Sequence, residues 1–438
     1  MSESVRKPIN VGLLGLGTVG CGVAEVLIGR HGSLLRRAGI DMRLQAALVR
    51  DPFKKRSFAV PAALMTTDPA GIVDNPKIDV VVEVLGGLEP AFSLMRRALT
   101  NGKHLVTANK EVMAHHGIEL LRLAQENRVD LFFEASVGGG IPLIGPFRQD
   151  LAANEISEIH AVINGTTNYI LTRMAQDGTE FSAALAEAQK LGYAEADPSN
   201  DVDGHDSAYK LAILATLAFG TPVFPDQIFR EGIRNVAPVD FDYVAELGYT
   251  LKLLAIAKRE GDAFEARVHP ALVTRGFLIS QVSGVENAVR IKGDLVGHAV
   301  FAGRGAGAGP TSSAIVADLL DLAHNIHAGV HARVPVRFDS ALKFRPMSEV
   351  VSRYFFRLWV ADRAGVLAKI GQVCADTGVS MAAIVQKETD PSAGTAEIVI
   401  LTHRAREGAM QEALARIAAL DVVDRVASFL RVEDLEDS

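Results

Sequence analysis

The chain has 438 residues, 48% of them hydrophobic, and its 45 Lys and Arg against 52 Asp and Glu leave a net charge of −7. At roughly 150 residues per domain, this length predicts about three domains. The acidic balance excludes a dedicated nucleic-acid binder, because phosphate recognition needs a clustered excess of Lys and Arg. No run of 18 uninterrupted apolar residues is present, so no membrane span is expected. Cys21 and Cys374 cannot form a disulfide framework and fit a reducing, cytoplasmic setting.

A glycine-rich turn follows the first predicted strand. Residues 9–14 (INVGLL) form an apolar run, and GLGTVG at 15–20 leads from it into a helix-compatible segment that extends to about residue 37. In a dinucleotide-binding fold the first glycine permits the tight turn, the second lets the pyrophosphate approach the backbone, and the third lets the helix pack on the strand. The flanking strand and helix favour this interpretation over a glycine turn without a ligand.

The second predicted strand, residues 44–49, ends where this fold usually places an acid for the adenosine ribose. Here Arg50 comes first and Asp51 second. Arg50 with Lys54 or Lys55 would pair a 2′-phosphate, whereas Asp51 would accept a hydrogen bond from a 2′-hydroxyl. The pattern favours NADP and leaves NAD open, with a solvated basic loop as the alternative.

Two further strands have the pattern of a parallel sheet. Residues 80–85 are apolar apart from Glu83, and residues 104–107 lead to Asn109 and Lys110 at the edge where a nicotinamide would lie. After a strand at 131–133, EASVGGGIP at 134–142 is a glycine-rich exit from the sheet. We therefore expect an α/β, Rossmann-type dinucleotide-binding domain at residues 1–135.

The middle of the chain, residues 136–345, departs from this alternation. Strands at 156–163 and 266–272 are mixed with helices at about 181–191, 205–219 and 242–259. The mixture predicts an α+β substrate-binding and dimerisation domain. Its last helix, at about 312–323, follows a second glycine cluster at 303–309 and is expected to return to the first domain.

The C-terminal residues 350–438 have the order strand, helix, strand, strand, helix, strand, at 354–360, 365–377, 380–387, 395–402, 406–417 and 423–432. This is the βαββαβ order of a ferredoxin-like module. The module resembles the ACT regulatory domain, with DRAGVL at 362–367 in the first strand-to-helix turn. Ala364 stands where that domain usually has a proline.

The densest polar segment is GYAEADPSNDVDGHD at 192–206, where five carboxylates fall within twelve residues. Asp206 and Lys210 are four residues apart at the start of an apolar helix, so both project from one face and can share a pocket. An EF-hand is excluded, because with Gly204 at the sixth position Lys210 takes the place of the required glutamate. A solvated acidic loop is one interpretation. The other is a site where carboxylates bind an α-amino group and Lys210 transfers a proton to a carbonyl under reduction.

Five ordered motifs carry a family resemblance: GLGTVG at 15–20, TANK at 107–110, EASVGGGIP at 134–142, NGTTNYIL at 164–171 and GYAEADPSNDVDGHDSAYKLAIL at 192–214. Together they resemble homoserine dehydrogenase over essentially the whole chain, in the long form with a C-terminal ACT domain. The resemblance implies NAD(P)-dependent interconversion of L-homoserine and L-aspartate 4-semialdehyde, in threonine, methionine and isoleucine biosynthesis.

The resemblance also implies roles for individual residues by motif position. Lys210 would donate or accept the proton at the substrate oxygen, and Lys110 would lie near substrate and nicotinamide. Substrate-binding residues would be Glu195, Asp206, Asp201, Gly165 and Thr166, with a plain Asn164-Gly165 turn as the alternative for that segment. Cofactor-binding residues would be Gly15, Gly17, Thr18, Val19, Gly20, Arg50, Thr107, Lys110, Gly192 and Gly309.

Further ligands follow from the same resemblance. A monovalent cation, commonly sodium, would take the Glu134 carboxylate and the backbone carbonyls of Val137, Gly139 and Ile141, oxygen donors of the kind that hard cations prefer. L-threonine would bind and inhibit at the ACT domain. The protein is expected to be a cytoplasmic homodimer or homotetramer.

Two other functions stay open at this point. A non-catalytic sensor of a dinucleotide and an amino acid would need no acid–base pair such as Asp206 and Lys210. Another amino-acid dehydrogenase would keep the cofactor turn and lose the other motifs. An aldehyde dehydrogenase with an acyl intermediate requires a catalytic cysteine, and the positions of Cys21 and Cys374 do not suit that role.

Overall fold

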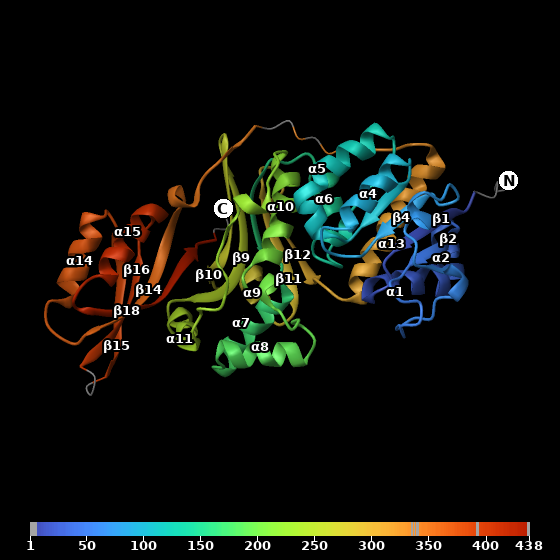
Figure 1. Ribbon diagram of the computed structural model, residues 1–438. Coiled ribbons are helices and arrows are strands. Elements are labelled where there is room, and N and C mark those ends of the chain that lie inside the picture. The colour runs from blue at the N-terminus through green and yellow to red at the C-terminus, as the bar shows by residue number, and fades with distance from the viewer. Residues whose placement is uncertain (1–6, 334–335, 337, 339–340, 391–393, 436–438) are drawn as a thin grey trace.

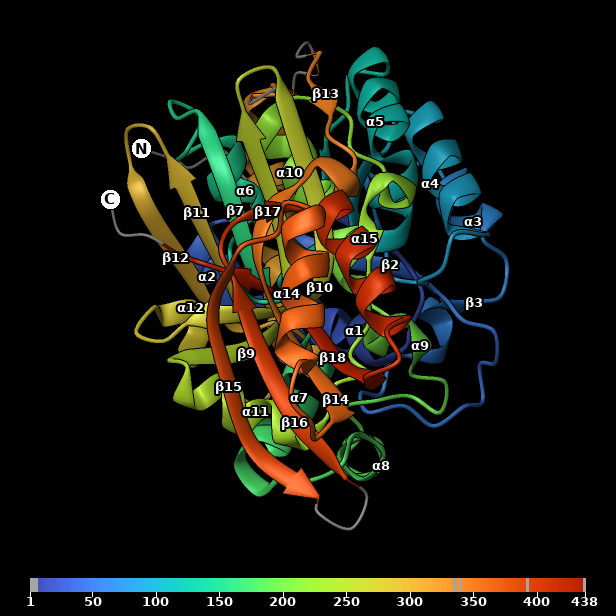
Figure 2. The ribbon, with the colours of Figure 1, turned by 90° about the vertical axis from the view of Figure 1, so that its left-hand side faces the viewer.

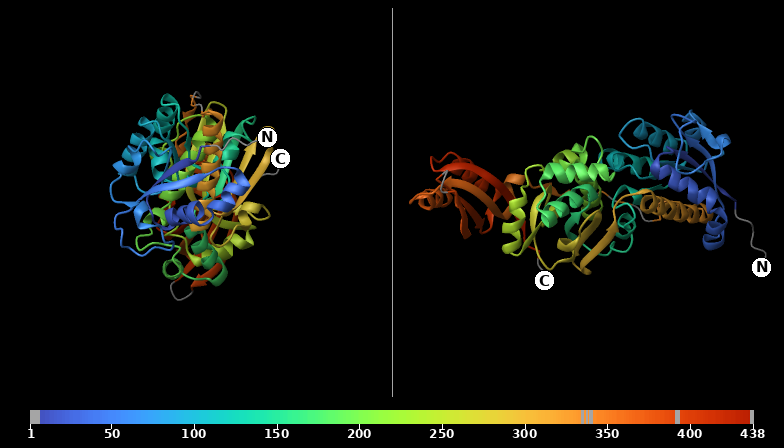
Figure 3. Two further views of the ribbon diagram at one scale, coloured as in Figure 1. Left: turned by 90° about the vertical axis from the view of Figure 1, so that its right-hand side faces the viewer. Right: turned by 90° about the horizontal axis from the view of Figure 1, so that it is seen from below.

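The computed structural model describes residues 7–333, 336, 338, 341–390 and 394–435. The molecule is elongated: the N-terminal elements lie at one end, the C-terminal elements at the other and the central elements between them (Figure 1; Figure 3, right). In these described residues no helix combines the length and the apolar character that crossing a membrane requires.

The N-terminal elements are built on a parallel sheet with the order β3-β2-β1-β4-β5-β6. Its strands are β1 (Ile9–Leu14), β2 (Met42–Leu48), β3 (Met65–Thr66), β4 (Val80–Glu83), β5 (His104–Thr107) and β6 (Leu131–Phe132). Strands covered by helices on both faces are mainly apolar, and all four residues of β4, three valines and Glu83, are buried. The strand order reverses between β1 and β4, and dinucleotides bind at such a reversal. The expected Rossmann-type fold is confirmed.

The helices of this part are α1 (Thr18–Ala24), α2 (His31–Ala38), α3 (Ala70–Val73), α4 (Ala91–Thr100) and α5 (Lys110–Glu126). A π-helical segment, Glu25–Gly29, and a break at Arg30 divide the helix that the sequence predicts to continue to residue 37. Glycines at 29 and 32 flank the break, and glycine has a low helix propensity.

Helix α13 (Ala308–Ala328) packs on the N-terminal sheet although it comes late in the chain. In Figure 1 it lies among the elements of the first domain, and Figure 3 (left) shows it from that side. Its buried residues Ile315, Leu319 and Leu322 belong to one hydrophobic core with Val11 and Leu13 of β1. The chain therefore leaves the first domain after β6, returns to it in α13, and leaves it again to reach β13 (Lys343–Phe344), which pairs with β10 (Ala263–Thr274).

The central elements include five neighbouring strands of a mixed sheet, in the order β12-β11-β7-β9-β10. These strands are β7 (Ile156–Val162), β9 (Tyr249–Glu260), β10 (Ala263–Thr274), β11 (Glu286–Gly293) and β12 (Gly297–Arg304), and the short β8 (Phe229–Arg230) pairs with β10. The helices are α6 (Ile144–Arg148), α7 (Gly165–Asp177), α8 (Phe181–Lys190), α9 (Ser199–Val202), α10 (His205–Phe219), α11 (Pro238–Glu246) and α12 (Leu278–Gln281). The predicted helix at 205–219 coincides with α10.

The helix predicted at 242–259 is wrong. Helix α11 ends at Glu246, Gly248 has a positive φ of 84°, and β9 starts at Tyr249. The segment is rich in Leu, Ala and Lys, which favour helices, but β9 lies between β7 and β10 with seven consecutive buried residues. Burial in the middle of a sheet overrides the local helix propensity.

The C-terminal elements have the predicted ferredoxin-like order: β14 (Val351–Ala361), α14 (Val366–Asp376), β15 (Met381–Asp390), β16 (Thr395–Thr402), α15 (Glu407–Ala418) and β18 (Val423–Glu433). The short strand β17 (Ala405–Arg406) pairs with β14, whereas the short strand β13 (Lys343–Phe344) pairs with β10 of the central elements. Helices α14 and α15 cover one face of their sheet (Figure 2). Strand β18 also pairs in parallel with β10, through Ala271 with Arg431 and Val273 with Glu433. The central sheet and the sheet of the C-terminal module therefore form one continuous sheet. The sequence does not predict this continuity.

A buried ion-pair network reinforces this junction. Arg357 on β14 donates to Asp240 of α11 at 2.8 Å and to Glu397 of β16 at 2.5 Å, and Tyr243 donates to Glu397 at 2.7 Å. The side chains of all three charged residues are at most 5% exposed. Because buried charges need counter-charges, Arg357 ties the C-terminal module to the central elements.

Arg357→Met keeps the bulk of the side chain and leaves Asp240 and Glu397 without their counter-charge. We expect the free energy of unfolding to fall by about 3–5 kcal/mol, measured by urea denaturation. The control is Arg363→Met, which removes an exposed pair with Asp421 and should change stability little. An Arg357→Met protein as stable as the wild type would show that the network does not hold the module in place.

Candidate active site

The turn between β1 and α1 has the geometry of a phosphate-binding loop. Gly15 has a φ of 106°, and a Cβ on Gly20 would lie 2.2 Å from the Gly15 carbonyl oxygen. Glycine is therefore required at both positions. Gly17 and Thr18 are exposed and Val19 is half-buried at the start of the helix, where N–H groups face a ligand. The predicted cofactor residues 15–20 thus share one turn at the reversal point of the sheet.

A buried carboxyl group organises the ends of β4 and β5. Glu83 is 0% exposed and accepts hydrogen bonds from the Thr107 hydroxyl at 2.6 Å, the Leu85 N–H at 2.7 Å and the Asn109 amide at 3.4 Å. Burial raises the pKa of Glu83 despite these donors. Asn109 caps α5 by accepting from the Val112 N–H at 3.1 Å, which fixes Lys110 at the first position of the helix.

Neither the role of Glu83 nor the Asn109 cap was predicted from the sequence. Glu83 is the single charged residue in an apolar strand, which could have indicated a buried polar contact. Its partners Thr107 and Asn109 lie on another strand and the loop that follows it, so the contact itself depends on the fold.

Two lysines meet at one buried aspartate. Lys210 Nζ donates to Asp206 Oδ2 at 2.7 Å and to the Ile163 carbonyl at 2.7 Å, and Lys110 forms an ion pair with the other oxygen of Asp206. Asp206 is 1% exposed. The predicted contact between Asp206 and Lys210 is confirmed, and the fold adds Lys110 from the N-terminal domain. We call these three residues the lysine–aspartate cluster.

The charges in this cluster make the two lysines unequal. Burial lowers the pKa of Lys210 although Asp206 favours its charged form, whereas the attraction of Asp206 raises the pKa of Lys110. Burial alone would raise the pKa of Asp206, but the two ammonium groups hold it well below its usual range. Of the two lysines, Lys210 therefore gives up its proton more readily.

Asn164 connects the cluster to a second carboxylate. Its side-chain amide donates to Asp201 Oδ1 at 2.7 Å and to Asp206 Oδ2 at 2.8 Å, while its oxygen caps α7 by accepting from the Thr167 N–H at 2.8 Å. Burial and the nearby Asp206 charge raise the pKa of Asp201. The sequence predicts either substrate binding by Gly165 and Thr166 or a plain Asn164-Gly165 turn here. In the structure Asn164 links α7, α9 and α10.

The remaining predicted substrate residues lie around this link. Gly165 is the first residue of α7, and the Thr166 hydroxyl donates to the Tyr193 carbonyl at 2.7 Å, which ties α7 to the 192–197 loop. Glu195 and Gly192 are exposed in that loop, and the Glu195 carbonyl accepts from Gln189 at 2.9 Å. The Glu195 carboxylate is thus accessible to solvent, whereas Asp201 is half-buried and Asp206 is buried.

Arg50 and Gly309 lie outside the lysine–aspartate cluster. Arg50 is exposed just after β2, and Gly309 is exposed in the first turn of α13. Arg56 donates to the carbonyls of Asp51 at 2.7 Å, Lys54 at 2.8 Å and Leu16 at 3.3 Å, so it holds the basic loop against the glycine turn.

The predicted cation residues form the exit from the N-terminal sheet. The Glu134 carboxylate accepts hydrogen bonds from the N–H groups of Leu143 at 2.6 Å, Ile144 at 2.9 Å and Gly145 at 2.6 Å. This carboxylate therefore caps the start of α6, a role that the sequence did not predict. Val137, Gly139 and Ile141 lie in the connection between Glu134 and α6.

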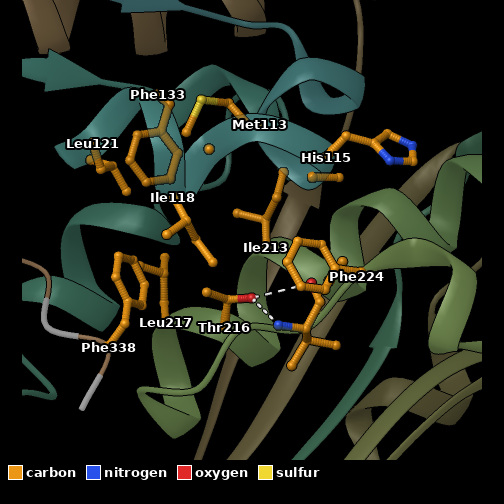
Figure 4. A pocket seen from close by; sticks show the side chains of 14 residues that line it. Met113, His115, Ile118, Leu121, Phe133, Ile213, Thr216, Leu217, Phe224 and Phe338 are labelled. Atoms are coloured by element: carbon orange, nitrogen blue, oxygen red, sulfur yellow. Dashed lines mark hydrogen bonds between the residues drawn. The ribbon is translucent and has the colours of Figure 1, made fainter. Parts of the chain in front are cut away.

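An apolar pocket lies along the two helices that carry the lysines. Figure 4 shows Met113 of α5 and Ile213 of α10 among the side chains that line it, with Phe133 and Phe224. Met113 is three residues after Lys110, and Ile213 is three residues after Lys210. Side chains within one turn of each lysine therefore line the same pocket between α5 and α10.

A parallel dinucleotide-type sheet joined to a buried lysine–carboxylate pocket defines a nicotinamide-dependent oxidoreductase. Family models agree with each part of the chain: "Homoserine dehydrogenase, NAD binding domain" matches residues 15–134, "Homoserine dehydrogenase" matches residues 142–320, and "ACT domain" matches residues 354–421. The chain belongs to the homoserine dehydrogenase family, oxidoreductases that act on a CH–OH group.

Relatives of known name match over nearly the whole chain. A homoserine dehydrogenase of Neisseria gonorrhoeae is 43% identical, covering 98% of this chain and 100% of its own. The crystal structure of a homoserine dehydrogenase from Thiobacillus denitrificans is 45% identical, with a TM-score of 0.92 over 98% of this chain and 99% of its own. A hyperthermophilic archaeal homoserine dehydrogenase in complex with NADPH is 28% identical, with a TM-score of 0.62 over 73% of this chain and 98% of its own.

Proposed function

We propose that the lysine–aspartate cluster is the catalytic site for interconversion of L-homoserine and L-aspartate 4-semialdehyde, with Lys210 as the proton donor or acceptor. The supporting observation is that Lys110 and Lys210 share Asp206 but differ in the direction of their pKa shifts. A group that transfers a proton needs a pKa near the working pH, which favours Lys210. Lys110 keeps its charge and stabilises negative charge on the substrate oxygen.

The bound nicotinamide accepts or supplies the hydride at the substrate carbon. In homoserine oxidation, neutral Lys210 accepts the hydroxyl proton, and Asp206 with the Ile163 carbonyl holds its Nζ in place. In the reverse direction the ammonium of Lys210 protonates the carbonyl oxygen. Glu195 and Asp201 bind the substrate, and the Glu195 carboxylate is exposed to it. Gly165 and Thr166, at the start of α7, complete the proposed substrate contacts.

Lys210→Ala is expected to lower the turnover of homoserine oxidation by about 10²–10⁴-fold, because it removes the proton acceptor. Steady-state kinetics measure this effect, and fluorescence titration should show unchanged cofactor binding. Lys190→Ala, at an exposed lysine at the end of α8, is the control. Near-normal turnover of the Lys210→Ala protein would contradict the assignment.

The pH profile provides a second test. Homoserine oxidation needs neutral Lys210, so turnover should rise with pH and level off below about 10.4, the ordinary lysine pKa, because burial lowers the pKa of Lys210. Asp206→Asn removes the charge that favours the protonated form, so the rising limb should move to lower pH. A limb that stays in place in the Asp206→Asn protein would show that Lys210 does not cause it.

NADP is proposed as the preferred cofactor. The support is the exposed Arg50 after β2, beside the basic loop that Arg56 holds against the glycine turn. Guanidinium groups bind a 2′-phosphate well. The archaeal relative in complex with NADPH is consistent with this choice. The other proposed cofactor contacts are Gly15, Gly17, Thr18, Val19, Gly20, Thr107, Lys110, Gly192 and Gly309.

Arg50→Ala should raise the KM for NADP about tenfold and leave the KM for NAD nearly unchanged, because NAD has no 2′-phosphate. Initial rates with each cofactor measure both constants. The control is Arg43→Ala, since Arg43 is near the opposite end of β2 and pairs with Asp41. Equal effects on both cofactors would contradict a 2′-phosphate contact.

A monovalent cation, sodium in the first instance, is proposed at the exit from the N-terminal sheet. Val137, Gly139 and Ile141 offer backbone carbonyl oxygens, which fit a hard cation. The Glu134 carboxylate already accepts hydrogen bonds from three N–H groups. It would therefore offer the cation an oxygen that these N–H groups also contact, and it would supply the negative charge of the site.

L-threonine is proposed as an inhibitor that binds the ACT domain. The support is a cavity of about 250 Å³ at the β14–α14 turn, lined by residues 360–368 together with Gln386, Ala396 and Ile398. Gly365, at the start of α14, lines this cavity and has a φ of 92°.

Millimolar threonine should inhibit homoserine oxidation, and Gln386→Ala should weaken the inhibition several-fold because Gln386 lines the cavity. Inhibition curves of the full-length protein measure the effect. Gln372→Ala, at a glutamine that donates to Asp376 at 2.7 Å, is the matched control. Activity that does not change with threonine would contradict the proposal.

We also propose a domain division and an oligomeric state for the protein. The domains would be residues 1–135 for NAD(P), 136–345 for substrate and dimerisation, and 350–438 for the effector, with α13 of the second domain packed on the first. A cytoplasmic homodimer or homotetramer is proposed from the family resemblance. The edge strands β12 and β15 at the two ends of the long sheet support assembly, because edge strands leave N–H and C=O groups unpaired.

A further inference from the structure

One segment of the central domain touches both the substrate-site helix α9 and the ACT module. This segment, residues 231–234, follows β8, and we call it the bridging segment. The Glu231 N–H donates to the Val268 carbonyl of β10 at 2.9 Å, and the Ile233 N–H donates to the Val202 carbonyl of α9 at 2.9 Å. A Cβ on Gly232 would lie 2.3 Å from that carbonyl oxygen, so backbone packs directly on backbone.

Arg234 holds both ends of α9. Its guanidinium donates to Asp203 Oδ1 at 2.6 Å, to Asp203 Oδ2 at 3.0 Å and to the Ser199 hydroxyl at 3.2 Å. Ser199 is the first residue of α9 and Asp203 follows its last. A helix of four residues has little stability of its own, so its position depends on such contacts. Between the two held ends is Asp201, the carboxylate that accepts from Asn164.

The other end of the bridging segment is tied to the ACT module. Arg431 of β18 donates to Glu231 at 2.7 Å and to Glu407 of α15 at 2.9 and 2.5 Å. Its guanidinium lies 4.9 Å from the Phe229 ring and 5.1 Å from the Phe429 ring, and its side chain is 3% exposed. One buried guanidinium thus joins a helix of the ACT module to the bridging segment.

The space next to this ion pair is not filled by packed side chains. A cavity of about 420 Å³ lies between the bridging segment and β18, lined by Glu231, Gly232, Asn235 and Val236 on one side and by residues 426–430 on the other. The ion pair between Arg431 and Glu231 therefore lies beside an open space between the bridging segment and β18.

We propose that Arg234 and Glu231 are positioning residues for the reaction: they hold α9, and with it Asp201, in register with Asn164 and Asp206, and Arg431 links their position to the ACT module. The inference rests on the proposed function of the lysine–aspartate cluster. The path is continuous: Glu407, Arg431, Glu231, the backbone at 232–233, Val202, Asp201, Asn164 and Asp206.

Arg234→Ala in the full-length protein tests the positioning role. We expect the KM for homoserine to rise about tenfold and the KM for NADP to stay unchanged, with Arg234→Lys restoring part of the loss. The matched control is Arg97→Ala, because Arg97 makes a similar two-pronged, solvent-exposed pair with Asp74 in the N-terminal domain. Wild-type values of both KM and kcat for Arg234→Ala would overturn the proposal.

Hydrogen–deuterium exchange tests the link to the ACT module without relying on activity. Glu231→Gln keeps the shape of the side chain and removes the charge that Arg431 binds. We expect the amides of residues 200–204 to exchange several-fold faster than in the wild type, with exchange in α4 unchanged. Unchanged exchange at 200–204 would overturn the link. A wild-type protein that fails to oxidise homoserine would instead refute the proposed function, and the exchange result would still stand by itself.

Discussion

The site depends on one carboxylate that is buried between two ammonium groups. Asp206 is 1% exposed, and an ion of that kind is tolerated only when opposite charges and hydrogen-bond donors surround it. Lys210 comes from the same helix, but Lys110 comes from the first helix after β5 of the N-terminal domain. The charge balance of Asp206 is therefore complete only when the two domains are packed together, and the double crossing of the chain through α13 holds them so.

A second buried carboxyl shows why Asp206 is suited to chemistry. Glu83 is as deeply buried, but its partners are the Thr107 hydroxyl, the Asn109 amide and a backbone N–H. Burial raises the pKa of Glu83, whereas the lysines depress that of Asp206. Glu83 therefore serves to fix the loops that present Lys110. Asp206 stays ionised and biases the protonation of the lysine beside it.

Features set by neighbours in the chain were predictable. The glycine turn, the four-residue spacing of Asp206 and Lys210, and the βαββαβ order depend on local pattern, and the structure has all three. Features set by distant partners were not. The residues of β9 favour a helix, and they form a strand because β7 and β10 pair with them on both sides. The Glu134 carboxylate accepts hydrogen bonds from N–H groups nine to eleven residues further along the chain. Asn164 links Asp201 and Asp206 across three helices, which no spacing rule indicates.

The continuous sheet constrains how the ACT module can work. A ferredoxin-like sheet has two edges, here β18 and β15, and β18 is used for pairing with β10 of the same chain. Among the strands that the structure describes, β15 is then the edge of this module whose outer backbone N–H and C=O groups have no neighbouring strand. Gln386 of β15 lines the cavity at the β14–α14 turn, so the free edge and that cavity adjoin. Between this edge and the central domain lie β16, β14 and β18, whose backbones are hydrogen-bonded in that order from β15 to β10. The connection from the free edge to α9 therefore runs through the continuous sheet, the ion pair between Arg431 and Glu231, and the hydrogen bond from the Ile233 N–H to the Val202 carbonyl.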